Sequence, residues 1–522
     1  MTTKKQLGAN GHQLSVQLAA AKANKRSADD EQRINVAGVG REVSVAYEQL
    51  RNAAEYTQEH LLIQNAIRRF FVRNLSFSSQ TNTSRSIANE LVIELIQSGY
   101  IENDTQPIEI IDKLSDVIQQ HYGNYWRLKN SGVKPITAQK WTLDLLSVGS
   151  EKIIIDDAIQ SIFIQFAYHH YQTVINKDIF DSGSGEVANY EASLYVAVYK
   201  ALLKSDIASV RYEMQRLYNV SDQDINEYFN FHKNVDAVFS SDLTERIERY
   251  INKFGAPLRI LKNMIQDNDE ASELLNDSDS FHAAYDEQIT KEYRSARSKL
   301  NKGLIKSIVF LLITKSLIGI GVEVPYDKLT IGDIVWLPLI INLLAPVVYM
   351  TLLRIGLKSP GTANTKAIQL YMDNMLYADQ SQANLYPSSK KSSYPIGFKI
   401  AFALMFLIVF VLVWMILTRL EFNFVQSTIF FIFFATANFL GFRLSRIVRE
   451  LELVSAKSGL LTTLRDFLYM PFILLGQWLS DKYKEVNIVA LILDTIIELP
   501  LKTVLRLIRQ WAEFINDKKD EI

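Results

Sequence analysis

The stretch FLLITKSLIGIGVEV, residues 310–324, decides the fold of this chain of 522 residues. It belongs to an apolar run over residues 304–324, which has the roughly 20 residues that a helix needs to cross about 30 Å of hydrocarbon. Lys315 stands near the middle of that run. An ammonium group that faces lipid at this depth is costly, so we expect Lys315 to face protein or a water-filled cavity.

Three further apolar runs also have the length of a membrane span, and they cover residues 334–353, 400–417 and 425–442. Helix is the expected structure of all four, because lipid offers backbone groups no hydrogen-bond partner. Lys and Arg alternate in the flanks: six in 291–306, one in 325–333, six in 354–399, one in 418–424 and five in 443–465. Because Lys and Arg favour the cytosolic flanks of spans, we predict a four-span domain over 303–442 in the plasma (cytoplasmic) membrane. Both termini and the loop 354–399 are then cytosolic.

The region 443–522 is predicted to lie at the cytosolic face of the membrane. Residues 467–479, FLYMPFILLGQWL, are too few to cross straight and indicate a re-entrant or interfacial segment. The apolar segment after it carries two acidic residues, Asp494 and Glu498. A basic amphipathic helix follows, for which we expect membrane-surface anchors or, alternatively, packing on protein. Its anchor residues are Lys502, Arg506, Arg509 and Trp511.

The first half of the chain is charged and holds no apolar run of spanning length. Residues 1–42 are polar and predict a disordered tail. From residue 43 to 302 apolar residues recur at helical spacing, which predicts a cytosolic helical domain. The DSGSGE segment, 181–186, is a possible hinge between two lobes. We expect 43–290 to fold without the membrane, and the whole chain to be all-α.

Composition and motifs exclude several kinds of chemistry. The chain has no cysteine, which removes thiolate nucleophiles and Cys-ligated metals. It also lacks the His-Glu-x-x-His zinc motif and the Gly-Lys-Ser/Thr ending of a phosphate-binding loop. A net charge of -1 argues against nucleic acid as a partner. We therefore expect no catalytic residue, metal or cofactor.

The partner of Lys315 is the open question of the membrane half. Glu323 lies about 12 Å further along the helix axis and about 80° around it, so pairing within one helix looks doubtful. We expect the partner to come from another segment, with Asn342, Asp494 and Glu498 as candidates. Backbone groups that Pro338 and Pro346 leave without a helical partner are the alternative. Lys315 then acts either as a buried clamp that fixes helix register or as part of an ion or substrate path.

Two segments resemble a known group of sequences. NLLAPVVYMTLLRIGLKSPGTANTKAI (342–368) and FLYMPFILLGQWLSDKYKE (467–485) are similar to segments of an uncharacterised family of multi-spanning membrane proteins from candidate-phyla bacteria. The resemblance implies a plasma-membrane location, and it implies no activity or site residue.

The expected function is a non-enzymatic, membrane-anchored interaction or assembly module. Its partners would be the lipid bilayer and either another protein or a second copy bound through residues 43–302. The alternative is a small-solute or ion transporter or channel with Lys315 in its pathway. The module is favoured because the other three spans hold almost no ionisable residues, whereas proton and ion paths need a chain of them.

Overall fold

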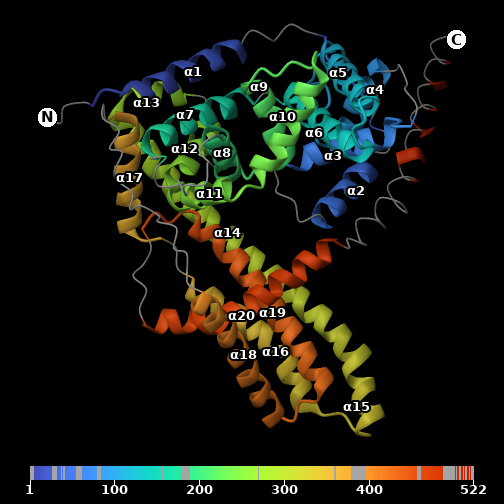
Figure 1. Cartoon of the computed structure of the whole chain (residues 1–522), viewed down its shortest axis with the longest axis vertical. Coiled ribbons are helices and arrows are strands. Elements are labelled where there is room, and N and C mark those ends of the chain that lie inside the picture. Colours follow the sequence, from blue (N-terminus) through green and yellow to red (C-terminus); the bar gives the residue numbers. More distant parts are fainter. Residues whose placement is uncertain are drawn as a thin grey trace.

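The computed structural model is all-α in the residues that it describes, as the sequence predicted (Figure 1). The predicted hinge at 181–186 lies outside those residues. The described residues are 5–25, 32–36, 38, 41–54, 61–78, 84–155, 157–175, 177, 189–268, 270–357, 360–377, 396–454, 460–485, 500, 502–504, 507–508, 511, 514–515 and 518.

The helical domain begins with a lobe that packs around one apolar core. Phe70, Leu91 and Leu114 are buried in that core, and each comes from a different helix. The last helix of the lobe begins at Pro135, where the ring suits a first-turn position whose N–H would have no helical partner. The helices are α2 (Arg41–Ala54), α3 (Leu62–Asn74), α4 (Ser84–Gln97), α5 (Ile110–Asn130) and α6 (Pro135–Ile154).

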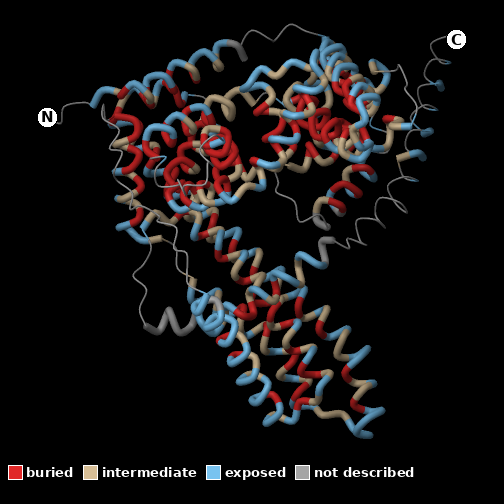
Figure 2. The backbone as a smooth tube through the Cα atoms, in the orientation of Figure 1, coloured by how far each residue is buried: buried red, intermediate tan, exposed pale blue. Residues whose placement is uncertain are grey.

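A second lobe follows, with a separate and larger core (Figure 2). Leu194, Val210 and Ile247 are fully buried in it. The π turn η4 interrupts the helical path directly after α8. The elements are α7 (Ala158–Val174), α8 (Tyr190–Val198), η4 (Tyr199–Leu203), α9 (Ile207–Leu217), α10 (Ile225–Phe239), α11 (Asp242–Phe254), α12 (Ala256–Asp267) and α13 (Ala271–Asn276).

Arg211 of α9 joins the two lobes from a fully buried position. Its Nε donates to the carboxylate of Asp144 in α6 at 3.1 Å, and its Nη1 donates to the backbone oxygen of His232 in α10 at 3.1 Å. A second carboxylate, that of Asp236, accepts from Nη2. Its three named acceptors come from two helices, α6 and α10, so this buried guanidinium fixes both of them to α9.

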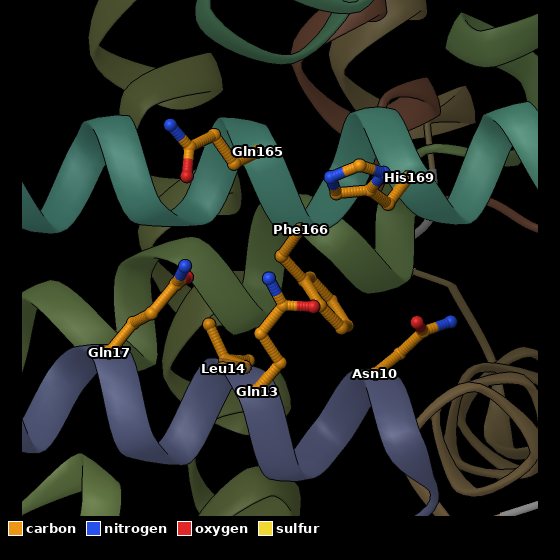
Figure 3. Close-up of a pocket in the computed structure, with 7 residues that line it drawn as sticks. All are labelled: Asn10, Gln13, Leu14, Gln17, Gln165, Phe166 and His169. Carbon is orange, nitrogen blue, oxygen red and sulfur yellow. The ribbon is translucent and has the colours of Figure 1, made fainter.

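The first helix, α1 (Ala9–Lys25), corrects the predicted disorder of residues 1–42. Its apolar residues Leu14 and Leu18 are buried in the core of the second lobe. Figure 3 shows Leu14 of α1 directed toward Phe166 of α7, with amide side chains at the rim. The remaining space, about 10 Å³, is about enough for one water molecule. Burial of the two leucines, together with a hydrogen bond from Ser15 to the backbone oxygen of Ser272, docks this helix on the second lobe.

Helix α17 (Thr362–Tyr377) lies in the predicted loop 354–399 and also belongs to the second lobe. Met372 and Leu376 are fully buried against it. The core of the second lobe therefore contains residues that precede the first span and residues that follow the second span in the sequence. A fragment over 43–290 lacks part of that core, and its folding without the membrane stays a prediction.

Helix α14 (Ser278–Ile318) runs from the helical domain into the membrane domain without a break. It continues through the π turn η5 (Gly319–Glu323) and α15 (Val324–Thr330). The predicted boundary between residues 302 and 303 falls inside this helix. In Figure 1 it forms the neck between the two parts of the molecule.

Among the described residues, four helices are long and apolar enough to cross a membrane, and each overlaps one predicted apolar run. They are the continuous helix Ser278–Thr330, α16 (Trp336–Gly356), α18 (Ile396–Arg419) and α19 (Phe424–Arg449). Three of the helices contain their run completely, and the run 334–353 begins two residues before its helix. Most residues of these spans are exposed or half-buried, as Figure 2 shows. The chain is therefore a membrane protein with four candidate spanning helices.

Helix α20 (Leu460–Glu485) contains the segment predicted to be re-entrant or interfacial, and it runs as one continuous helix across the other membrane helices (Figure 1). Phe472 is buried against α18 and α19. Gly476 meets α19 so closely that a Cβ would lie 2.3 Å from the backbone oxygen of Ala435. The helix shows no reversal of direction, so the re-entrant alternative is wrong and a helix lying across the bundle remains.

Candidate intramembrane polar site

Lys315 and Glu323 form a buried ion pair within one continuous helical segment. The Nζ of Lys315 lies 2.6 Å from Oε1 of Glu323, and the two side chains are 3% and 0% exposed. The expectation that this pairing is doubtful is therefore wrong. The two side chains are long enough to bridge the axial separation between Lys315 and Glu323. The π turn η5 also contributes, because its i→i+5 hydrogen bonds turn the helix less per residue and bring Glu323 back toward the face of Lys315.

Asn342, one of the candidate partners of Lys315, bonds to Glu323 instead and connects the ion pair to two other spans. Its Nδ2 donates to Oε2 of Glu323 at 3.1 Å and to the backbone oxygen of Gln426 at 3.2 Å. Both carboxylate oxygens of Glu323 are thus occupied. Phe433 of α19 covers the ammonium group of Lys315, with the ring centroid 4.9 Å from Nζ. One cluster therefore binds α14, α16 and α19 together.

A second polar layer lies next to the first and was not predicted. Asp327 is fully buried, and its two carboxylate oxygens accept from Nδ2 of Asn423 and Nε2 of Gln426, both at 2.8 Å. The same two amides form a capping box at the start of α19. The signal that could have found this layer is the Asn-x-x-Gln spacing immediately before the fourth apolar run.

The two polar layers together hold two carboxylates, those of Glu323 and Asp327, and one ammonium group. One ammonium group, that of Lys315, faces one carboxylate in the inner layer. Among the described residues, Asp327 in the outer layer meets amide donors and no cation. Within the part of the chain that the structure describes, the buried Oδ1 of Asn342 and Oγ of Ser427 have no hydrogen-bond partner. The cluster therefore holds buried charge in place through one ion pair and a set of amide donors.

The predicted residues near the C-terminus divide into two groups. Lys502 is described, and it lies against the helical domain. Its Nζ is 3.2 Å from Oε1 of Glu48 and 3.4 Å from Oε1 of Glu94. Burial opposes ionisation of Glu94, but Lys502 and Arg73 outweigh it and hold the pKa of that carboxyl below its usual value. In this structure Lys502 therefore contacts protein.

Of the other residues predicted near the C-terminus, the structure describes Trp511. Trp511 is 70% exposed, which is consistent with a side chain that anchors the helix at a membrane surface. Asp494, Glu498, Arg506 and Arg509 lie outside the described residues. The membrane-surface role of this segment stays a prediction.

The described residues contain no group of three or more His, Asp or Glu side chains that could hold a metal ion. A comparison of the chain with protein families, with curated proteins and with solved structures finds no match. The function proposed below therefore depends on the geometry of the chain itself.

Proposed function

We propose that this chain is a non-enzymatic, membrane-anchored interaction or assembly module, whose helical domain is held at a fixed place on the cytosolic face of the plasma membrane. The observation that supports it best is the continuity of α14. Tyr285 and Ile289 are buried in the core of the helical domain, and Leu304 and Leu311 are buried in the core of the membrane domain. One helix thus belongs to two cores, which couples the domains rigidly.

A second connection supports the same proposal. Glu450 lies at the end of α19, and its carboxylate is 3.0 Å from Nζ of Lys204 in the helical domain. The backbone oxygen of Glu450 accepts from Nη1 of Arg259 at 2.9 Å. The helical domain is therefore fixed to the first and the fourth span. Such a mounting suits a surface that must meet its partner at a set height and angle above the lipid.

The polar site fits this proposal as a clamp. Lys315 and Glu323 satisfy each other, and Asn342 extends the contact to α19. Polar partners that specify one packing of helices are the best-attested use of buried charge. The clamp would keep the spans in one register and hold the helical domain above them.

A small-solute or ion transporter is the second candidate, and Asp327 is the observation that favours it. This carboxylate is buried with amide donors alone. It lies beyond the π turn η5, and π turns are frequent at functional sites. Intramembrane carboxylates of this kind relay protons or coordinate cations in transporters.

One experiment compares the two candidates on the full chain. A photo-crosslinking residue replaces Ile136, which is 83% exposed on the helical domain, and Ile320, which is 71% exposed on the membrane domain, serves as the control. The module predicts a discrete crosslinked protein species from position 136 in cells and lipid adducts from position 320. It also predicts that proteoliposomes holding the chain leak protons and cations no faster than empty ones.

The opposite pattern would establish the transporter. It consists of no discrete species from position 136 together with a flux that Lys315→Met or Asp327→Asn abolishes. A crosslinked species with the mass of two chains would identify self-association as the partner contact.

A further inference from the structure

The helical domain contains a cleft where its two lobes meet, away from the polar site in the membrane. Its volume is about 600 Å³, within the range of about 300–1,000 Å³ typical of small-molecule sites. The first lobe contributes the start of α3 and the end of α6, and the second contributes α7, η4 and α9. Ligand sites are frequent at such junctions.

One carboxylate of the cleft has no ion-pair partner among the described residues, whereas the other charged side chains are paired. Lys152 forms ion pairs with both Asp157 and Glu213. The other oxygen of Glu213 lies 3.2 Å from Nη2 of Arg216. Glu151 also lines the cleft, and no side chain among the described residues forms a hydrogen bond or ion pair with its carboxylate. Burial raises the pKa of Glu151 to about 7, against the smaller opposing effect of Lys152.

The rest of the lining consists of an aliphatic wall, two tyrosines and five uncharged polar side chains. The polar ones are Gln64, Gln160, Ser205, Ser209 and Gln266. A ligand must bring one positive charge for Glu151 and an apolar body for the aliphatic wall. That wall consists of Leu61, Leu62, Ile63, Val148, Ile155, Ile159 and Leu203. A molecule with several charges would place its additional charges against this wall, where they are costly to bury.

The backbone beside the cleft is irregular in a way that points to a function. Tyr199 and Leu203 line the cleft from the π turn η4. Lys204 directly after it has a φ of 57°, in the left-handed region that a residue with a side chain seldom adopts. Such conformations and π turns both cluster at binding sites.

We infer that this cleft is a binding site for a small organic amine, with the ammonium group of the ligand against Glu151 and its apolar body against the aliphatic wall. The inference goes beyond the proposed module, because it adds a ligand to the helical domain. It does not depend on the membrane domain being a clamp or a path.

Hexylamine is the first probe, and hexanoate is the probe of equal chain length and opposite charge. Each is titrated calorimetrically into the full chain in lipid nanodiscs, with empty nanodiscs as the blank. Glu151→Gln keeps the shape of the side chain and removes its charge, and Glu287→Gln makes the same change at an exposed position on α14. We expect hexylamine to bind the parent and Glu287→Gln equally and hexanoate to bind neither.

Glu151→Gln should bind hexylamine about ten- to a hundred-fold more weakly, the worth of one hydrogen bond to a charged group. The variant should also fold, because it removes an unpaired charge. The folded-state pKa is raised, so the parent loses stability as pH rises toward 7, and Glu151→Gln should melt at or above the parent at pH 8. Ile155→Trp, a change at a 42% exposed position on the rim, is a second variant that should block the cleft by volume.

The pH dependence gives an independent readout. Hexylamine keeps its charge between pH 6 and pH 8, whereas Glu151 passes from mostly protonated to mostly ionised. Binding to the parent should therefore strengthen about ten-fold over this range, with Lys152, Asp157, Asp206 and Glu213 as the other charged groups near the carboxyl. Equal binding of hexylamine to Glu151→Gln, equal binding of hexanoate to the parent, or no binding of hexylamine would each overturn the inference.

Discussion

Removal of the Lys315 ammonium group is the most direct test of the clamp. Lys315→Met keeps the length of the side chain and leaves Glu323 buried, with only the amide of Asn342 as a partner. Loss of one member of a buried pair costs about 3–5 kcal/mol. At about 2–4 °C per kcal/mol for a unit of 150–250 residues, the melting temperature should fall by about 6–20 °C.

The double variant Lys315→Met with Glu323→Leu should recover most of that loss. An ion pair that apolar side chains replace is often neutral in stability, and Asn342 keeps the backbone oxygen of Gln426 as an acceptor at 3.2 Å. We expect the double variant to melt within about 4 °C of the parent. The difference between the single and double variants then measures the coupling of the two charges.

The assay and its control follow from the composition of the chain. Six tryptophans and no cysteine allow melting to be followed by intrinsic fluorescence in detergent, without thiol dyes. Lys306→Met makes the same change at an exposed position on α14 and should leave the melting temperature unchanged within about 2 °C. The clamp is refuted if Lys315→Met melts like the parent and the double variant does not differ from it.

Three further predictions concern topology, domain limits and packing. Single cysteines at Lys328 and Lys366, both exposed, should react with an impermeant maleimide on intact cells only at 328, and labelling of 366 from outside would contradict the charge pattern. The fragment 43–290 should show a lower melting temperature or aggregation compared with the full chain, which also supplies α1 and α17, as measured by circular dichroism. Gly476→Leu should destabilise the full chain by about 1–3 kcal/mol, because its Cβ would meet the backbone of Ala435, and an unchanged melting curve would show that α20 is not packed there.

The spans were predictable because length and hydropathy suffice for a helix in lipid, whatever it packs against. The burial of Lys315 was predictable for the same reason, since hydrocarbon penalises an exposed charge at that depth. Its partner was not, because the π turn η5 has no signature in GIGVE that an α-helical count could detect. Asp327 lies just outside the apolar run, and its burial depends on Asn423 and Gln426, which reach it from a distant part of the chain.

The helical domain shows where hydrophobic periodicity fails to predict how a helix packs. Helix α1 has little apolar character, and its docking depends on Leu14 and Leu18 meeting a core that forms from distant residues. The same holds for α17, because a segment between two spans predicts only a connecting loop, whereas this one is part of the helical domain. Contacts across hundreds of residues leave no local trace in sequence, yet the packing of each short helix depends on them.

Helix α19 connects the features on which the two proposals depend. At its start, Gln426 binds Asp327 through its side chain and Asn342 through its backbone oxygen, so the polar site fixes this end. At its other end, Glu450 meets Lys204 and Arg259. Arg259 also donates to the backbone oxygen of a residue in η4, the π turn that lines the cleft.

A rigid helix held at both ends transmits position, since its length cannot change without breaking its own hydrogen bonds. A ligand that altered η4 would therefore act on the same helix that the polar site fixes. The polar site contacts one end of α19, and the cleft is connected to its other end through Arg259 and η4. This arrangement allows ligand binding in the helical domain to depend on how the spans are packed.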